Sequence, residues 1–268
     1  MALRGRFTLI WILLILAASV CFGAEPEPAA VSAFNTYVGA VESRLAQDHR
    51  SARSFLEPSL SSSSLEGMRL RNGEFVIEQI SPPKGATLPG ALVHDWRGTA
   101  FIAGANTADF ERLLRDFDRY PQYFSPEVLQ TKVVAQHDGE SLVLIRVKQR
   151  HVITVTLDTT YDVAFGRLDS QHAYSTSRSV RISEVMQART ARGLDGLLWR
   201  LNTYWSFEER DGGLYIQIES VSLTPSIPYG LRWAVAPYVE SIPRESLEFT
   251  LRSASNALRR RNSNQKGQ

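Results

Sequence analysis

The stretch from Ile145 to Phe165 alternates apolar and polar residues, and four polar side chains interrupt its apolar positions. These are Gln149, His151, Thr159 and Tyr161. Because alternate residues of a strand share one face of the sheet, the four side chains would point toward the core. Such groups could hydrogen-bond the polar head of a bound molecule. The alternative is that they lie where the strand bends or leaves the core.

Two charged residues lie in later stretches that also have the pattern of strands. Glu219 is on the same side of its strand as Tyr215. Burial in a dry cavity would raise the pKa of its carboxyl, so it could act as an acid. Arg178, if it points inward, would bind a carboxylate or phosphate head group. An outward side chain on a solvated sheet face is the alternative for both residues.

Aromatic residues precede and enter the last predicted helix. Tyr229, Trp233, Tyr238 and Phe249 could form a lid over a cavity, or a lip that faces a membrane, and ordinary core packing is the alternative. The predicted ligand-binding set is therefore Gln149, His151, Tyr161, Arg178, Glu219 and Trp233.

Signatures of catalysis and cofactor binding are missing from the sequence. It has no Gly-rich phosphate loop, no HExxH, no GxSxG and no cysteine cluster. None of its five histidines is spaced as a metal ligand. A formal net charge of +2 gives no sign of a nucleic-acid partner. We assign no catalytic residue, no metal and no cofactor.

The elements that must position these residues follow from hydrophobic periodicity. Residues 90–261 are expected to form one α+β domain. It would begin with a strand over 92–103 and a helix that Thr107 caps and Pro121 ends. A long strand over 145–165, bent near 149–152, would follow. Strands over 173–185, 198–210 and 214–224 and a helix from about Pro243 to Arg260 would complete it. Asp211, Gly212 and Gly213 mark a hairpin between the last two strands.

The segments outside that domain have other patterns. Residues 24–89 begin with a proline-rich linker and continue with a helix over Ser32–Ser54 and a short strand over Glu74–Ile80. Residues 262–268 are expected to form a disordered tail. The arginines at 259–261 would lie at a helix end, where the dipole favours cations, and could touch anionic lipid. A solvated helix end is the alternative.

The first 23 residues have the pattern of a secretory signal peptide. Two arginines precede an apolar run over Phe7–Val20, which is short for a membrane span. Cys21 and Gly23 are small residues suited to cleavage after Gly23. Cleavage there would remove Cys21, the single cysteine of the chain, and leave a net charge of 0. We expect an exported protein, periplasmic or secreted. An uncleaved membrane anchor and a lipoprotein anchored through Cys21 are the alternatives.

Two segments resemble the START-like superfamily, with its polyketide cyclase, coenzyme Q-binding and pollen-allergen-like branches. The first is TADFERLLRDFDRYPQYFSPEV, residues 107–128, and the second is SIPRESLEFTLRSASNAL, residues 241–258. The resemblance covers about residues 90–260. It implies a helix-grip fold, in which a curved antiparallel sheet of six or seven strands wraps around a long C-terminal helix. It also implies an elongated cavity for an apolar ligand, but no shared catalytic residues.

Three functions remain open from the sequence. The first is a carrier or sensor of a hydrophobic small molecule or lipid. The second is an enzyme of the aromatase/cyclase or dehydratase type, which would need an acid and a base converging in the cavity, such as Glu219 with His151. The third is a non-catalytic module that docks another envelope protein, with a filled cavity and an exposed apolar patch.

Overall fold

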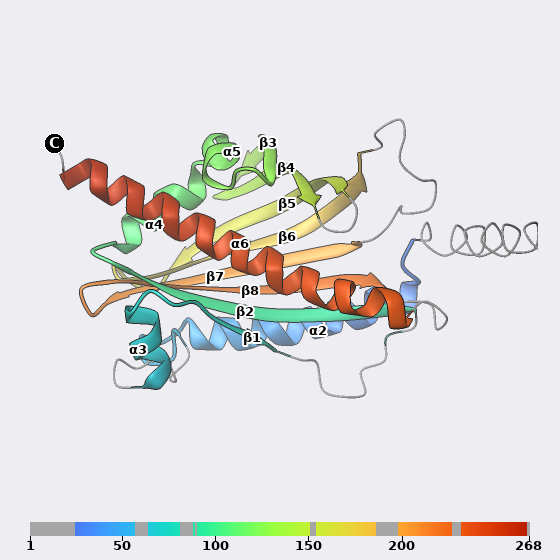
Figure 1. Cartoon of the computed structure of the whole chain (residues 1–268), viewed down its shortest axis with the longest axis horizontal. Helices are drawn as coiled ribbons and strands as arrows, with labels where there is room; N and C mark the ends of the chain where they lie inside the picture. The colour runs from blue at the N-terminus through green and yellow to red at the C-terminus, as the bar shows by residue number, and fades with distance from the viewer. Residues whose placement is uncertain are drawn as a thin grey trace, which may run out of the picture.

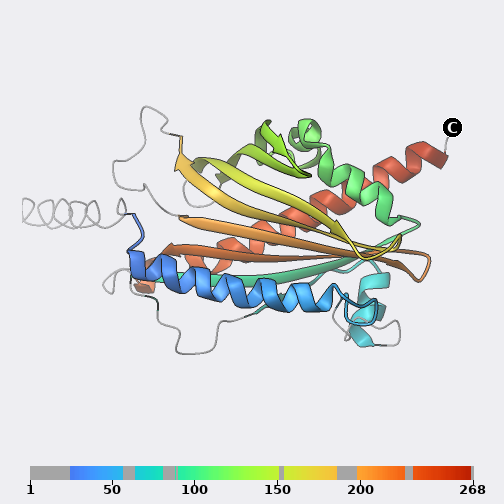
Figure 2. The same cartoon turned by 180° about the vertical axis from the view of Figure 1, so that it is seen from behind.

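The computed structural model describes residues 25–56, 64–80, 88, 90–150, 154–185, 198–226 and 232–266. One antiparallel sheet of eight strands curves around the long helix α6, and a second long helix, α2, lies on the opposite face of the sheet (Figures 1 and 2). The chain therefore has the α+β helix-grip architecture that the sequence predicted, with eight strands instead of six or seven.

The sheet has the strand order β1-β2-β8-β7-β6-β5-β4-β3. Its strands are β1 (Val76–Gln79), β2 (Ala91–Ala103), β3 (Val128–His137), β4 (Glu140–Arg150), β5 (Thr154–Arg167), β6 (His172–Glu184), β7 (Arg200–Arg210) and β8 (Gly213–Pro225). The helices are α2 (Pro28–Asp48), α3 (Leu65–Arg71), α4 (Thr107–Arg115), the 3-10 turn η2 (Phe117–Arg119), α5 (Tyr120–Tyr123) and α6 (Arg232–Lys266).

Helix α6 packs against the concave face of the sheet. Leu247, Leu251, Ala254 and Leu258 are its buried stripe, and they join side chains of β2, β7 and β8 in the largest apolar cluster. Gly98 of β2 allows this close approach, because a Cβ atom there would lie 3.3 Å from the Leu247 and Leu251 methyl groups. The predicted C-terminal helix is confirmed but longer, and it continues past residue 261 to Lys266.

Helix α2 covers the convex face of the same sheet. Phe34, Val38, Val41 and Leu45 of this predicted helix pack on apolar side chains of β7 and β8. The helix begins at Pro28, earlier than the predicted Ser32, because proline suits the first turn. The middle of the sheet is thus buried on both faces, between two helices.

The prediction of one long strand over 145–165 is wrong, because this stretch belongs to two antiparallel strands. β4 ends at Arg150 and β5 begins at Thr154, and Gln149 pairs with Val155 across the two. Both strands keep the same two-residue alternation, and no glycine or proline marks the reversal, so the sequence gives no turn signal. Residues 151–153 of this connection lie outside the described residues.

Two local predictions around α4 also differ from the structure. The side chain of Asn106, not Thr107, caps the helix and accepts a hydrogen bond from the backbone N–H of Asp109. α4 ends at Arg115, and Pro121 lies in the first turn of α5 instead of ending a helix. The Asp211–Gly212 hairpin is confirmed between β7 and β8, with positive φ at both residues.

The N-terminal extension is joined to the sheet by β1, which pairs with β2 as an edge strand. The predicted signal segment, residues 1–23, lies outside the described residues. Within the described ranges, none of the helices combines the length and the apolar character that crossing a membrane requires.

Candidate ligand-binding cavity

A cavity of about 310 Å³ lies between the concave face of the sheet and α6. Its apolar walls come from four places: the α4–α5 region (Leu114, Phe117, Tyr120, Phe124), the strands β4 and β5 (Ile145, Val147, Val155, Leu157, Val163), the strands β7 and β8 (Leu201, Trp205, Ile218) and α6 (Ile242, Leu247, Phe249). Because β5 alternates, its odd-numbered residues from Val155 to Val163 all face the cavity. The strand periodicity read from the sequence therefore produces this wall.

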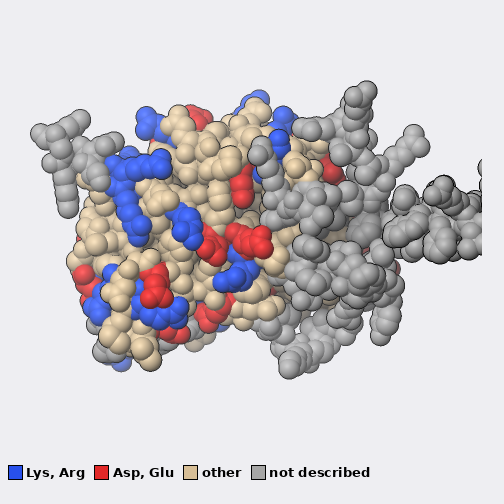
Figure 3. All heavy atoms as spheres, viewed as in Figure 1, with Lys and Arg blue, Asp and Glu red and all other residues tan. Residues whose placement is uncertain are grey.

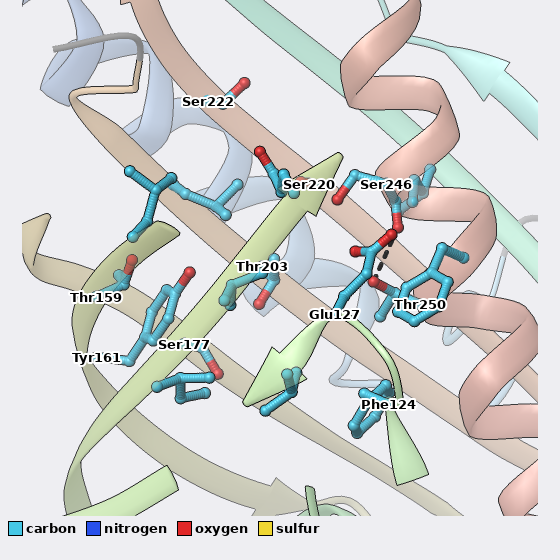
Figure 4. Close-up of a pocket in the computed structure, with 18 of the residues that line it drawn as sticks. Phe124, Glu127, Thr159, Tyr161, Ser177, Thr203, Ser220, Ser222, Ser246 and Thr250 are labelled. Carbon is cyan, nitrogen blue, oxygen red and sulfur yellow. Dashed lines mark hydrogen bonds between the residues drawn. The ribbon is translucent and has the colours of Figure 1, made fainter. Parts of the chain in front are cut away.

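Hydroxyl groups interrupt the apolar wall in several places. Figure 4 shows Thr159, Tyr161, Ser177 and Thr203 on the sheet, and the shorter side chains of Ser220 and Ser222 on β8. Ser246 and Thr250 come from α6, where the Thr250 hydroxyl donates to the Ser246 carbonyl oxygen at 2.9 Å. A bound molecule would therefore meet mostly apolar carbon, with hydroxyls available for a polar group.

Glu127 is the one carboxylate in the described lining of this cavity. It lies between α5 and β3, and Figure 4 shows its side chain directed toward Ser246 and Thr250 of α6. Within the described residues its carboxylate has no hydrogen-bond partner. Burial without a compensating charge raises the pKa of Glu127 to about 7. Glu127 can thus exchange a proton near neutral pH at this end of the cavity.

Two of the predicted ligand-binding residues line the cavity. Gln149 lies near the end of β4, and the ring of Tyr161 is buried on β5. Burial raises the pKa of the Tyr161 phenol well above its usual range, so it stays a neutral hydrogen-bonding group. His151 lies outside the described residues, and Trp233 belongs to the part of α6 whose side chains are not described.

Arg178 and Glu219 lie on the other face of the sheet, away from the cavity. Arg178 Nε donates to Glu42 Oε1 of α2 at 2.5 Å. Glu219 accepts hydrogen bonds from Arg97 and Arg44 and is almost fully buried. The parity of their strands explains the placement, because their immediate neighbours Ser177 and Ser220 face the cavity. We therefore assign Arg178 and Glu219 to the contact with α2 and not to ligand binding.

The contact between α2 and the sheet is a buried polar network. Tyr37 donates to Asp95 Oδ2 at 2.7 Å, and Asp95 itself is fully buried. Burial, followed by the nearby charge of Glu219, raises the pKa of Asp95 to about 7. Tyr204 of β7 donates to Glu42 at 2.9 Å. Arg178 and Glu219, which the sequence offered as ligand contacts, thus help to fix the position of a helix.

Glu127 is the residue that the sequence interpretation missed. It follows a short aromatic connection and precedes a strand, and such a position usually carries a solvated carboxylate. A useful signal is its setting between Phe124 and Val128, both of which pack in the main apolar cluster. A lone acid within an apolar segment is a candidate for a buried carboxyl group. In the described part of the chain no cluster of His, Cys, Asp and Glu could hold a metal ion.

No family model matches the chain, and no curated protein matches it. Solved structures with similar folds include the Zhui aromatase/cyclase from Streptomyces sp. R1128, with 12% identity over 63% of this chain and 96% of that one and a TM-score of 0.47. A STAR-related lipid transfer protein from Xanthomonas axonopodis has 18% identity over 68% and 98%, with a TM-score of 0.43. Human STARD10 has 9% identity over 76% and 79%, also with a TM-score of 0.43.

These similarities are too low to indicate a ligand or an activity. The fold assignment rests on the described topology itself. An eight-stranded antiparallel sheet, with β1 at one edge and β3 at the other, curves around α6. By that topology, the chain has the START-like, helix-grip fold that the resemblance of its sequence implied.

Proposed function

We propose that this protein is an exported carrier or sensor that binds a hydrophobic small molecule or lipid between the sheet and α6. The observation behind the proposal is the cavity of about 310 Å³, with apolar walls and scattered hydroxyls. Its size is at the lower end of the range for small-molecule sites, and ligand sites are usually apolar with a few polar groups that fix orientation. Export rests on the first 23 residues of the sequence.

The polar end of the proposed ligand would lie at Glu127, Ser246 and Thr250. These groups favour a head that is neutral or cationic and that can donate a hydrogen bond, because an anionic head would meet the Glu127 carboxylate. An apolar body would then lie along Val155, Leu157 and Trp205. An alcohol, a phenol or an amine on an apolar skeleton has this chemistry.

A second candidate function is an enzyme of the cyclase or dehydratase type. Glu127 favours it, because a carboxyl group with a pKa of about 7 is suited to general acid–base work at neutral pH. The acid and base pair first considered, Glu219 with His151, no longer supports this function, because Glu219 lies on the other face of the sheet. Turnover of the extracted ligand by the purified protein would establish the enzyme.

The test is native mass spectrometry of the full chain, purified from its own source without denaturation, followed by denaturing extraction. We expect a bound apolar molecule of defined mass. The variant Thr203→Phe fills the cavity and should abolish retention. Val180→Phe adds the same bulk at an exposed position of β6 and should retain the ligand. A ligand-free mass that persists after incubation with a lipid and quinone extract would refute the carrier.

A further inference from the structure

A second pocket, of about 610 Å³, lies on the far side of α5 from the apolar cavity. Its walls are polar and come from the segment 119–125 and from the C-terminal part of α6. The described lining is Leu113, Arg119, Gln122, Tyr123, Ser125, Ser253, Asn256, Ala257, Arg260 and Arg261. This described lining contains three guanidinium groups and no carboxylate. We call it the arginine pocket.

The arginines of this pocket are incompletely paired. Arg261 Nη1 is buried and has no hydrogen-bond partner among the described residues. Arg260 is exposed and has no ion pair in the same part of the chain. Arg119 Nε has only a distant acidic neighbour, with Asp116 Oδ2 3.8 Å away. A buried guanidinium nitrogen without a partner is costly, and an anion beside these guanidinium groups would compensate their charge.

Position on the molecule is consistent with an accessible anion site. Figure 3 shows several Lys and Arg side chains near the end of the molecule where α6 finishes, with acidic side chains nearer the middle and lower on the same end. The guanidinium group binds phosphate oxygens in a two-pronged geometry. Ser125, Ser253 and Asn256 add neutral groups that can hydrogen-bond the remaining oxygens.

We propose that the arginine pocket binds a phosphate monoester group through Arg119, Arg260 and Arg261. The phosphate belongs either to a soluble metabolite or to a lipid head group. The site is separate from the apolar cavity and has the opposite charge, so the proposal does not depend on the proposed carrier function. It also gives the arginine triplet of the sequence a role beyond that of a solvated helix end.

The first experiment is isothermal titration calorimetry of the full chain with inorganic phosphate. The second is cosedimentation of the full chain with phosphatidylcholine vesicles, with and without phosphatidic acid. In both, Arg119→Gln and Arg260→Gln are compared with Arg259→Gln, which removes the same charge from the same helix outside the pocket. Thermal unfolding of each variant establishes that it folds.

We expect the two pocket variants to weaken binding by at least about tenfold, since each loses a charge-assisted hydrogen bond. Arg259→Gln should stay within about twofold of the unmodified protein, as expected for a screened surface charge. Phosphate binding in the calorimeter identifies a soluble source. Binding to phosphatidic acid vesicles alone identifies a lipid head group. Equal losses in all three variants, or no binding to either probe, would overturn the proposal.

Discussion

Arg97 and Glu219 form an ion pair inside the contact between α2 and the sheet, with 3.0 Å between Arg97 Nη2 and Glu219 Oε2. They are opposite one another on β2 and β8, and the exposed fractions of their side chains are only 6% and 3%. Arg44 of α2 contacts the other oxygen of the same carboxylate at 2.5 Å. One carboxylate thus ties two strands and a helix together.

Glu219→Ala should therefore destabilise the protein strongly. Removing one partner of a buried pair leaves an uncompensated charge and costs about 3–5 kcal/mol. Glu248→Ala breaks the more exposed Arg252–Glu248 pair on α6 and should cost less than about 1 kcal/mol. Urea unfolding of both variants measures the difference. Similar free energies of unfolding would mean that the buried network does not hold α2 in place.

Phe34→Ala tests the apolar part of the same contact. The Phe34 ring is 2% exposed and packs between α2 and the sheet, so its truncation should cost about 3–5 kcal/mol. Asn35→Ala, one residue along on the exposed side of the helix, should cost less than about 0.5 kcal/mol. Urea unfolding checks both values. A small loss for Phe34→Ala would show that α2 is not part of the cooperative fold.

His49, just past the end of α2, should make the protein sensitive to acid. Burial, helped by the nearby Arg44 charge, lowers the pKa of His49 to about 4 from an ordinary value of 6.5. The folded state thus keeps the ring neutral, and its contribution to stability is complete above pH 6.5 and lost as the pH falls toward 4.

The ring stacks on Tyr174 with 4.2 Å between centroids, and its Nε2 lies 2.8 Å from Ser206 Oγ. His49→Gln should remove part of the acid loss measured by unfolding at several pH values. His137→Gln, at an exposed site, is the control and should leave the pH profile unchanged. If His49→Gln lost as much stability in acid as the unmodified protein, that loss would be due to other groups.

Glu127→Gln should change how ligand binding depends on pH. The pKa of Glu127 is raised, so its carboxyl is protonated in the folded protein up to about pH 7. A neutral apolar ligand excludes water from this carboxyl, which penalises the charged form, so the ligand should bind more tightly below pH 7 than above it. The effect is about tenfold for each further unit by which the ligand raises the pKa.

Fluorescence titration with the neutral hydrocarbon 1,6-diphenyl-1,3,5-hexatriene measures this dependence, because this probe has no hydrogen-bond donor that could pair with the Glu127 carboxylate. Glu127→Gln should bind the probe with the same affinity on both sides of pH 7. Glu140→Gln, at the exposed start of β4, should behave like the unmodified protein. Probe affinity that changes equally with pH in both variants would remove Glu127 from the cavity's chemistry.

Much of the fold could be predicted from the sequence, because periodicity and turn chemistry are local signals. The C-terminal helix and the glycine turn after Asp211 are examples. The reversal between Gln149 and Val155 could not be predicted, because β4 and β5 alternate in the same way and no turn residue separates them. The number of strands was underestimated for this reason and because no strand was predicted over β3 (Val128–His137).

The candidate site could be predicted only in part. Tyr161 follows from alternation once its strand is known. Glu219 and Ser220 are neighbours on one strand, and only the packing of α2 against the convex face decides which of the two meets the cavity. A sequence pattern says that two faces exist, but not that a helix from another segment covers the second face and needs charged partners there.

The direction in which α2 runs determines how the molecule would be oriented on a surface to which its N-terminal side is attached. The first turn of α2 lies near the end of the molecule where α6 begins, and the last turns of α6 lie at the opposite end (Figures 1 and 2). Arg260 is roughly 40 Å along the axis of α6 from its start, at 1.5 Å per residue. A chain tethered through the segment before Pro28 and standing upright would hold its apolar cavity between the tether and the arginine pocket. The pocket would then meet a second surface, or the surrounding solution, and not the surface to which the chain is attached.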